Sequence, residues 1–116
     1  MNVSTVSTTA GSFSTASTSY VDVTGASITL STAGTYLILA SAETYSSMSQ
    51  YDGAIALTDG TTYFNASVPY GAYFGPWFAQ IQVIISSTKT YKIQIKSTTG
   101  NTTYIRNEAI SAIRLQ

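Results

Sequence analysis

Apolar residues occur at every second position in several short segments of this chain, and turn residues separate the segments. The most regular segment is residues 90–96, where Tyr91, Ile93 and Ile95 alternate with polar side chains. Such alternation is typical of a β-strand that has one face in a core and the other in water. Further strands are predicted at residues 20–23, 27–30, 35–40, 53–57, 62–64, 77–86, 104–106 and 109–115.

Glycine, aspartate and proline positions predict where these strands end. Asp59 and Gly60 lie between two apolar runs and predict a β-hairpin, since both residues tolerate the positive φ of a type I′ turn. A turn is also predicted at Thr24-Gly25, and the polar residues 45–50 are predicted to form a loop. Residues 68–78 hold five aromatic residues, two glycines and two prolines, so they cannot form a long regular strand. Many short strands at near-regular spacing predict an all-β fold, an antiparallel two-sheet sandwich of the jelly-roll type.

The N-terminal segment has a weaker pattern than the rest. Residues 2–19 alternate small polar residues with sparse apolar ones, which fits either an extended arm or an edge strand whose order depends on a neighbour. We therefore divide the chain into an N-terminal extended arm, residues 1–12, and one jelly-roll domain, residues 13–116. A length of 116 residues fits one core of ordinary size.

Two of the predicted strands, residues 36–40 and 77–85, are apolar or uncharged on both faces. One face of the second strand is apolar, and the other carries Phe78, Gln80, Gln82 and Ile84. An uncharged second face with aromatic and glutamine side chains has the composition of an interface core, where charged residues are depleted. We infer a homo-oligomer in which these two strands and the terminal strand line the contact.

The polar residues of this chain carry mainly hydroxyl groups rather than charges. The chain contains 19 Thr and 17 Ser, and only 9% of its residues are charged. Threonine is β-branched and packs well on the pleated surface of a sheet. The formal net charge is zero and the five basic residues are scattered, so no nucleic-acid partner is expected. A neutral domain has little charge repulsion between copies, which favours self-association.

The chain has few reactive side chains. It contains no His and no Cys, so acid–base chemistry would require its five acidic residues, and hydrolysis would need two of them to converge. We therefore expect a protein that is not an enzyme and that needs no cofactor or metal. No segment approaches the roughly 18 consecutive apolar residues of a membrane-spanning helix, and no signal peptide is evident. Neither membrane insertion nor secretion is expected.

The order of these segments resembles the C1q/TNF-like jelly roll, and specifically the small trimeric versions found in bacteriophage virion proteins. The matching segments are residues 13–23 (FSTASTSYVDV), 28–30 (ITL), 34–38 (GTYLI), 54–61 (AIALTDGT) and 109–115 (AISAIRL). The resemblance implies a homotrimer in which one sheet of each subunit faces a threefold axis. The residues that it implies for the axial contact are Tyr36, Ile38, Phe78, Gln80, Gln82, Tyr104 and Ile110. Each could instead be a core residue of its own subunit, since a one-residue difference in strand phase exchanges the two faces.

Two functions follow from this resemblance. The first is a bacteriophage capsid decoration or cement protein, a virion structural protein that binds the major capsid protein or another virion protein and stabilises the shell. The second is the receptor-binding head of a phage fibre, which recognises a host surface glycan or protein. Both functions place the protein on the virion. In both, the protein associates with copies of itself as a homotrimer and has no membrane partner.

The aromatic segment supplies the candidate partner-binding loop, which consists of Tyr70, Tyr73, Phe74 and Trp77. Exposed aromatic rings on a loop give a large contact area at a low entropic cost, and they also suit the faces of sugars. The alternative is that these rings close one end of the sandwich.

Overall fold

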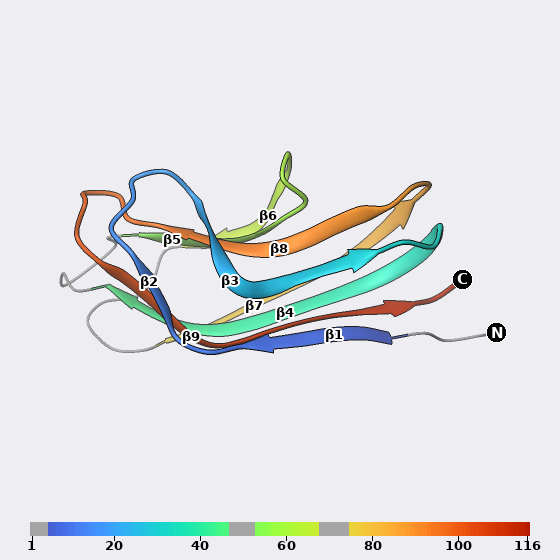
Figure 1. The fold of residues 1–116 in the computed structure, drawn as a ribbon, viewed down its shortest axis with the longest axis horizontal. Coiled ribbons are helices and arrows are strands. Elements are labelled where there is room, and N and C mark those ends of the chain that lie inside the picture. The colour runs from blue at the N-terminus through green and yellow to red at the C-terminus, as the bar shows by residue number, and fades with distance from the viewer. Residues whose placement is uncertain (1–4, 47–52, 68–74) are drawn as a thin grey trace.

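The computed structural model describes residues 5–46, 53–67 and 75–116, and these residues form nine β-strands. The strands are β1 (Thr5–Ala10), β2 (Phe13–Thr15), β3 (Val21–Leu30), β4 (Gly34–Ser46), β5 (Ala54–Thr58), β6 (Tyr63–Ser67), β7 (Gly75–Ile85), β8 (Lys89–Lys96) and β9 (Thr103–Arg114). They make two antiparallel sheets that lie face to face (Figure 1). The prediction of an all-β, two-sheet antiparallel fold is confirmed. Within the described residues there is no helix long and apolar enough to cross a membrane.

The two sheets, called sheet A and sheet B here, interleave along the sequence. Sheet A has the strand order β1-β9-β4-β7, with β2 also paired to β9, and sheet B has the order β3-β8-β5-β6. Neighbouring strands come from distant parts of the chain, as for β4, which pairs with both β7 and β9. A chain that passes repeatedly between two sheets in this way has the connectivity of a jelly roll.

Inward-facing side chains of both sheets form one hydrophobic core. Along β4, every second residue from Tyr36 to Ser46 is buried. Strand β8 buries Tyr91, Ile93 and Ile95, as its alternation predicts. Burial of each aliphatic side chain of this kind contributes roughly 1.5–3 kcal/mol, so the core is the main source of stability.

Strand β3 runs through the turn predicted at Thr24-Gly25 without reversing. Both of its ends pair with β8, and the ladder is interrupted between Asp22 and Ser27. Gly25 has a φ of 83°, which a residue without a Cβ adopts readily. The glycine therefore marks a β-bulge, and the predicted turn is wrong because both halves of the segment belong to one strand.

Strand β4 continues into the segment that was predicted to be a loop. Tyr45 pairs with Tyr104 of β9, and Ser46 pairs with Thr103. The rings of Tyr45 and Tyr104 stack with their centroids 4.5 Å apart and their planes within 7°. Cross-strand pairing thus extends β4 through Tyr45 and Ser46, the first two residues of the predicted loop. The rest of that loop, residues 47–50, lies outside the described residues.

The N-terminal residues Thr5–Ala10 form an edge strand of sheet A. They pair with β9 from Thr5 opposite Ile113 to Ala10 opposite Glu108. Of the two alternatives for this segment, the edge strand is the one observed. The predicted boundary after residue 12 falls at the Gly11-Ser12 break between β1 and β2, and both of these strands pair with the same neighbour.

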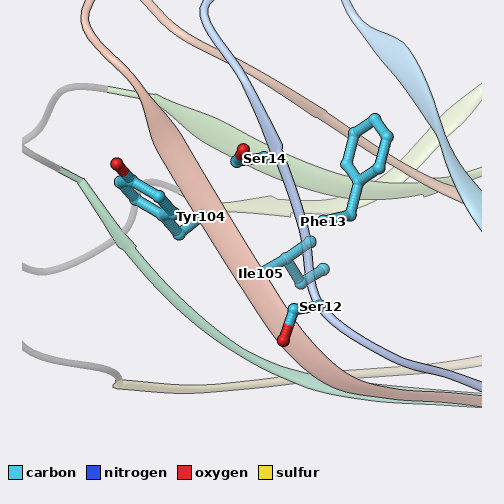
Figure 2. A pocket seen from close by; sticks show the side chains of 5 residues that line it. All are labelled: Ser12, Phe13, Ser14, Tyr104 and Ile105. Atoms are coloured by element: carbon cyan, nitrogen blue, oxygen red, sulfur yellow. The ribbon is translucent and has the colours of Figure 1, made fainter.

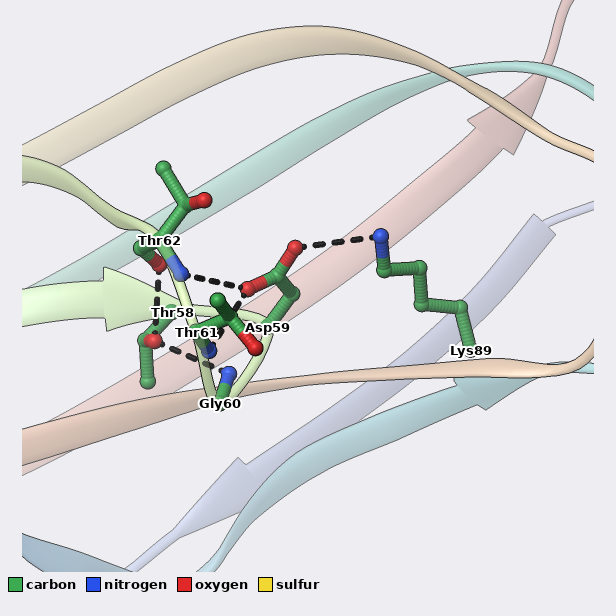
Figure 3. A network of polar contacts seen from close by, with 6 residues as sticks. All are labelled: Thr58, Asp59, Gly60, Thr61, Thr62 and Lys89. Atoms are coloured by element: carbon green, nitrogen blue, oxygen red, sulfur yellow. Dashed lines mark hydrogen bonds and ion pairs between the residues drawn. The ribbon is translucent and has the colours of Figure 1, made fainter.

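The connection between β5 and β6 is organised by the side chain of Asp59 (Figure 3). Its Oδ1 accepts hydrogen bonds from the backbone N–H groups of Thr61 and Thr62 at 2.9 and 2.8 Å. Its Oδ2 lies 3.1 Å from Nζ of Lys89. The hairpin predicted here is confirmed, but of its two central residues Gly60 alone has a positive φ, of 96°, so the turn is not of type I′. The aspartate side chain, rather than two residues with positive φ, closes the turn.

Replacement of Asp59 by Ala is expected to lower the free energy of unfolding by about 1–2 kcal/mol, because two backbone N–H groups lose their acceptor. The pKa of the Asp59 carboxyl is lowered mainly by the hydrogen bond from the backbone N–H of Thr62. The hydrogen bond from Thr61 and the interaction with Lys89 lower it further. A lowered pKa stabilises the fold above the ordinary value of 3.8, and this stability is lost as the pH falls through the folded value. Guanidinium denaturation between about pH 7 and pH 2 should therefore show that the difference in the free energy of unfolding between wild type and Asp59→Ala becomes smaller as the pH falls. The matched variant Asp59→Asn keeps an acceptor oxygen and should lose less stability at pH 7.

Candidate functional site: the outer face of sheet A

The side chains of β4, β7 and β9 that point away from the core together form the outer face of sheet A. The register arranges them in rows across the three strands, so that Leu37 of β4 lies between Gln82 of β7 and Ile113 of β9. The side chains of this face are Leu37, Leu39, Ser41, Glu43 and Tyr45 of β4, Phe78, Gln80, Gln82 and Ile84 of β7, and Tyr104, Arg106, Ala109, Ser111 and Ile113 of β9.

Large apolar side chains on this face are open to solvent. Ile84 is 81% exposed and Phe78 is 62% exposed, and Gln80 and Gln82 lie exposed between them on β7. Strand β7 carries no charged residue and is the last strand of its sheet, so among the described strands one of its backbone edges has no partner. An exposed apolar strip of this kind marks a contact surface, because its transfer from water is favourable by roughly 25 cal/mol per Å².

The two charged side chains of this face neutralise each other. Nη2 of Arg106 lies 3.2 Å from Oε2 of Glu43, and Nδ2 of Asn107 donates to Oε1 of Glu43 at 2.6 Å. The hydrogen bond from Asn107, followed by that from Arg106, lowers the pKa of the Glu43 carboxyl, which favours its ionised form. Because its net charge is zero, the pair does not repel a second copy of the same face, and it can fix the orientation of that copy.

A shallow hollow opens at the end of sheet A where β2 pairs with β9 (Figure 2). It has a volume of about 510 Å³ and is lined by Ser12, Phe13, Ser14, Tyr104 and Ile105. Three of these residues carry hydroxyl groups and none is charged. The hollow adjoins the outer face of sheet A through Tyr104, and its lining suits an uncharged group more than an ion.

Solved structures with a similar arrangement include a viral protein and two TNF-like proteins. PRD1 vertex protein P5 has a TM-score of 0.61 at 12% identity, with 97% of this chain and 96% of that chain covered. Murine APRIL has a TM-score of 0.65 at 7% identity, with 98% and 100% covered, and Eiger TNF from S. frugiperda has 0.61 at 11%, with 97% and 93% covered. This chain has a C1q/TNF-like jelly-roll fold. No protein-family model and no curated protein matches the sequence.

In this C1q/TNF-like jelly roll, four of the residues predicted to make the axial contact lie on the outer face of sheet A. Phe78, Gln80 and Gln82 are exposed on β7, and Tyr104 is half-buried on β9 beside Tyr45. Their role in an intersubunit contact stays a prediction.

The other three residues predicted for the axial contact point into the core of their own subunit. Tyr36 is 4% exposed, Ile38 is 0% exposed and Ile110 is 1% exposed, so each occupies the core position that was the alternative to the contact. Strand β4 is apolar on both faces, and its hydrophobic pattern therefore does not define which face is inward. The register with β7 shows that Leu37 and Leu39, rather than Tyr36 and Ile38, share a face with Gln82 and Gln80.

One of the four residues predicted for the partner-binding loop is not available to a partner. Trp77 is 6% exposed, and its Nε1 donates to the backbone oxygen of Asn65 at 3.0 Å. This bond joins β7 of sheet A to β6 of sheet B and closes that side of the sandwich, so Trp77 has the structural role that was the alternative. Tyr70, Tyr73 and Phe74 lie outside the described residues.

The described acidic side chains lie in separate parts of the jelly roll. The carboxylate of Asp22 on sheet B accepts from Nε2 of Gln94 at 2.7 Å and lies 2.9 Å from Nζ of Lys92, and these contacts, in that order, lower its pKa. Glu43 lies on sheet A, and Asp59 lies in the β5–β6 turn. Among the described residues there is no group of three or more His, Cys, Asp and Glu residues that could hold a metal ion.

Proposed function

We propose that this protein is a non-enzymatic viral structural protein that forms a homotrimer through the outer face of sheet A. The observation that carries this proposal is the exposure of Phe78 and Ile84 on a face whose two charges cancel. An isolated subunit would keep these side chains in water, whereas self-association removes them.

The proposed contact differs from the one expected from the sequence. It keeps Phe78, Gln80, Gln82 and Tyr104, and it replaces the three core residues with Leu37, Leu39 and Ile84. These side chains lie in adjacent rows of one face, so a single flat surface can present all of them to a second copy.

The proposed place of the trimer is the virion, where it acts as a capsid decoration or cement protein. Its partner there is the major capsid protein or another virion protein. Support comes from the likeness, over nearly the full length of both chains, to a protein described as a PRD1 vertex protein. Recognition of a host glycan or protein by a fibre head is the alternative, and it rests on the aromatic loop, of which the one described residue is buried.

Light scattering of the purified chain at several concentrations is expected to give three times the monomer mass of 12.3 kDa. The trimer should then co-sediment with shells that lack the protein and should raise the temperature at which those shells open. A monomeric mass would overturn the homotrimer. A stable trimer that does not bind shells would instead remove the decoration role and direct the next assay to host glycans.

A further inference from the structure

Glu108 is an ionisable residue inside the sandwich that the proposed function does not use. Its side chain points inward from β9 and is 1% exposed. Among the described residues, no other residue forms a hydrogen bond with either of its carboxyl oxygens. An ionised carboxylate in such surroundings loses its hydration, and the interaction with the backbone of Glu108 itself compensates less than burial costs, which favours either protonation or entry of water.

A bulge in β9 places Glu108 on the inner face. Ile105 and Ile110 are both buried although they are five positions apart, and strict alternation would put them on opposite faces. Asn107 between them has a φ of 55°, and the pairing of β9 with β4 shifts register at this level, between Ser41 and Glu43. The extra residue reverses the phase of the strand, and Glu108 becomes inward-facing as a consequence.

The neighbour of Glu108 on one side is the edge strand β1. Ala10 is the register partner of Glu108, and it packs partly buried against the core. Thr8 of the same strand donates from Oγ1 to the backbone oxygen of Gly25 in β3 at 3.3 Å, so β1 also helps to join the two sheets. Strand β1 is the last strand of sheet A, whereas β4 on the other side of β9 has a neighbour on both sides. Displacement of β1 is therefore the least costly way to admit water to Glu108.

Within residues 5–46, 53–67 and 75–116, no charged side chain faces Glu108 from the strands that pack against β9. The inward-facing described residues of the strands that pack against β9 are Thr8 and Ala10 of β1, Phe13 of β2, Val23, Ala26 and Ile28 of β3, Tyr36, Ile38, Ala40, Ala42 and Thr44 of β4, and Tyr91, Ile93 and Ile95 of β8.

The titratable members of that set are Tyr36 and Tyr91, and the hydroxyl of Tyr36 donates to the backbone oxygen of Thr32 at 2.8 Å. Burial raises the pKa of Tyr91, so it stays neutral at physiological pH. The basic groups at the strand ends are engaged elsewhere: Lys89 pairs with Asp59, and Arg114 donates to the backbone oxygen of Ala33 at 2.9 Å.

We propose that Glu108 makes the docking of edge strand β1 dependent on pH, with the ionised carboxylate loosening β1 and the protonated carboxyl holding it against the sandwich. Burial raises the pKa of the Glu108 carboxyl above its ordinary value of 4.5. A raised pKa gives stability that is fully present below the ordinary value and is lost as the pH rises through the folded value. Acidification from neutral pH thus tightens β1, in the opposite direction to the effect of Asp59.

Hydrogen exchange of the β1 amides tests this proposal. Exchange is measured by mass spectrometry on wild type, Glu108→Gln and the control Asp22→Asn, which removes an exposed carboxylate from sheet B. At about pH 8, Glu108→Gln should raise the protection factors of residues 5–10 by roughly tenfold or more, and those of β5 by less. Wild type should approach the variant as the pH falls toward 5, and Asp22→Asn should behave as wild type in β1.

Two outcomes would overturn the proposal. The first is that the protection factors of β1 depend on pH equally in wild type and in Glu108→Gln. The second is that Glu108→Gln raises the protection factors of β1 and β5 equally, which would indicate a global gain in stability without selective release of β1. Carbon-13 NMR titration of the Glu108 carboxyl in the wild-type chain provides a second measurement that needs no variant. A carboxyl that titrates at the ordinary value, or one whose titration leaves the β1 signals unchanged, would also overturn it.

Discussion

Replacement of both Phe78 and Ile84 by Glu is expected to convert the proposed trimer into a folded monomer. Self-association would bury these two positions, and a buried carboxylate without a partner costs several kcal/mol. Like charges from different subunits would also face one another. The dissociation constant should rise by at least about 100-fold, which is roughly 3 kcal/mol. Light scattering should then give a mass of 12.3 kDa at concentrations where wild type is three times larger.

The matched control is Ser27→Glu, which adds a charge to an exposed position on sheet B. It should leave the mass of wild type unchanged, because that face is not in the proposed contact. Far-ultraviolet circular dichroism of the double variant should keep the strand signal, since both side chains point away from the core. A double variant that retains the full trimer mass would show that copies associate through a different surface.

Replacement of Gly53 by Ala is expected to lower the free energy of unfolding by about 3–5 kcal/mol, for two reasons that add. A Cβ at this position would lie 2.9 Å from the backbone oxygen of Lys96 and still closer to Oγ1 of Thr103. Gly53 also has a φ of 140°, a backbone conformation that residues with a side chain rarely adopt. Guanidinium denaturation at fixed protein concentration measures the loss.

Two further glycine variants separate these reasons. Gly11→Ala adds a Cβ with no atom within 4 Å and should change stability by less than about 0.5 kcal/mol. Gly60→Ala also meets open space but has a φ of 96°, so it should lose only the backbone contribution of about 1–2 kcal/mol. If Gly53→Ala lost no more than Gly60→Ala, the steric contact with Thr103 and Lys96 would not be significant.

Strand positions could be predicted where side chains of different polarity alternate. Strand β8 has apolar residues at Tyr91, Ile93 and Ile95 and polar residues between them, and its inner face was predicted correctly. Strand β3 was predicted as two strands because Gly25 is a turn residue in most contexts, and only pairing of both halves with β8 makes it one bulged strand. The β5–β6 hairpin was located from Asp59, although its hydrogen bonds depend on where Lys89 and Thr62 lie in space.

The candidate contact surface could be predicted only in part. The sequence indicated that an uncharged second face on residues 77–85 would need a partner, and Phe78 and Gln80 do lie there. It did not indicate which face of β4 belongs to that surface, because residues 36–40 are apolar on both sides. The exposed Ile84 was placed on the correct face of its strand, but its 81% exposure requires the full packing to be known.

The buried position of Glu108 had a signal in the sequence that alternation alone obscures. Ile105 and Ile110 are separated by an odd number of positions, and both can be inward only if the strand contains a bulge. The positive φ of Asn107 and the register with β4 place that bulge before Glu108, and only this placement makes Glu108 inward.

The sequence by itself determined that this protein is an all-β jelly roll with little reactive chemistry, because alternation, turn residues and composition are local properties of the chain. The tertiary structure alone decided the phase of β4, the bulges of β3 and β9, the burial of Trp77 and the docking of β1. Each of these depends on which strand lies beside which, and the free energy that selects among registers comes from contacts between residues far apart in the sequence.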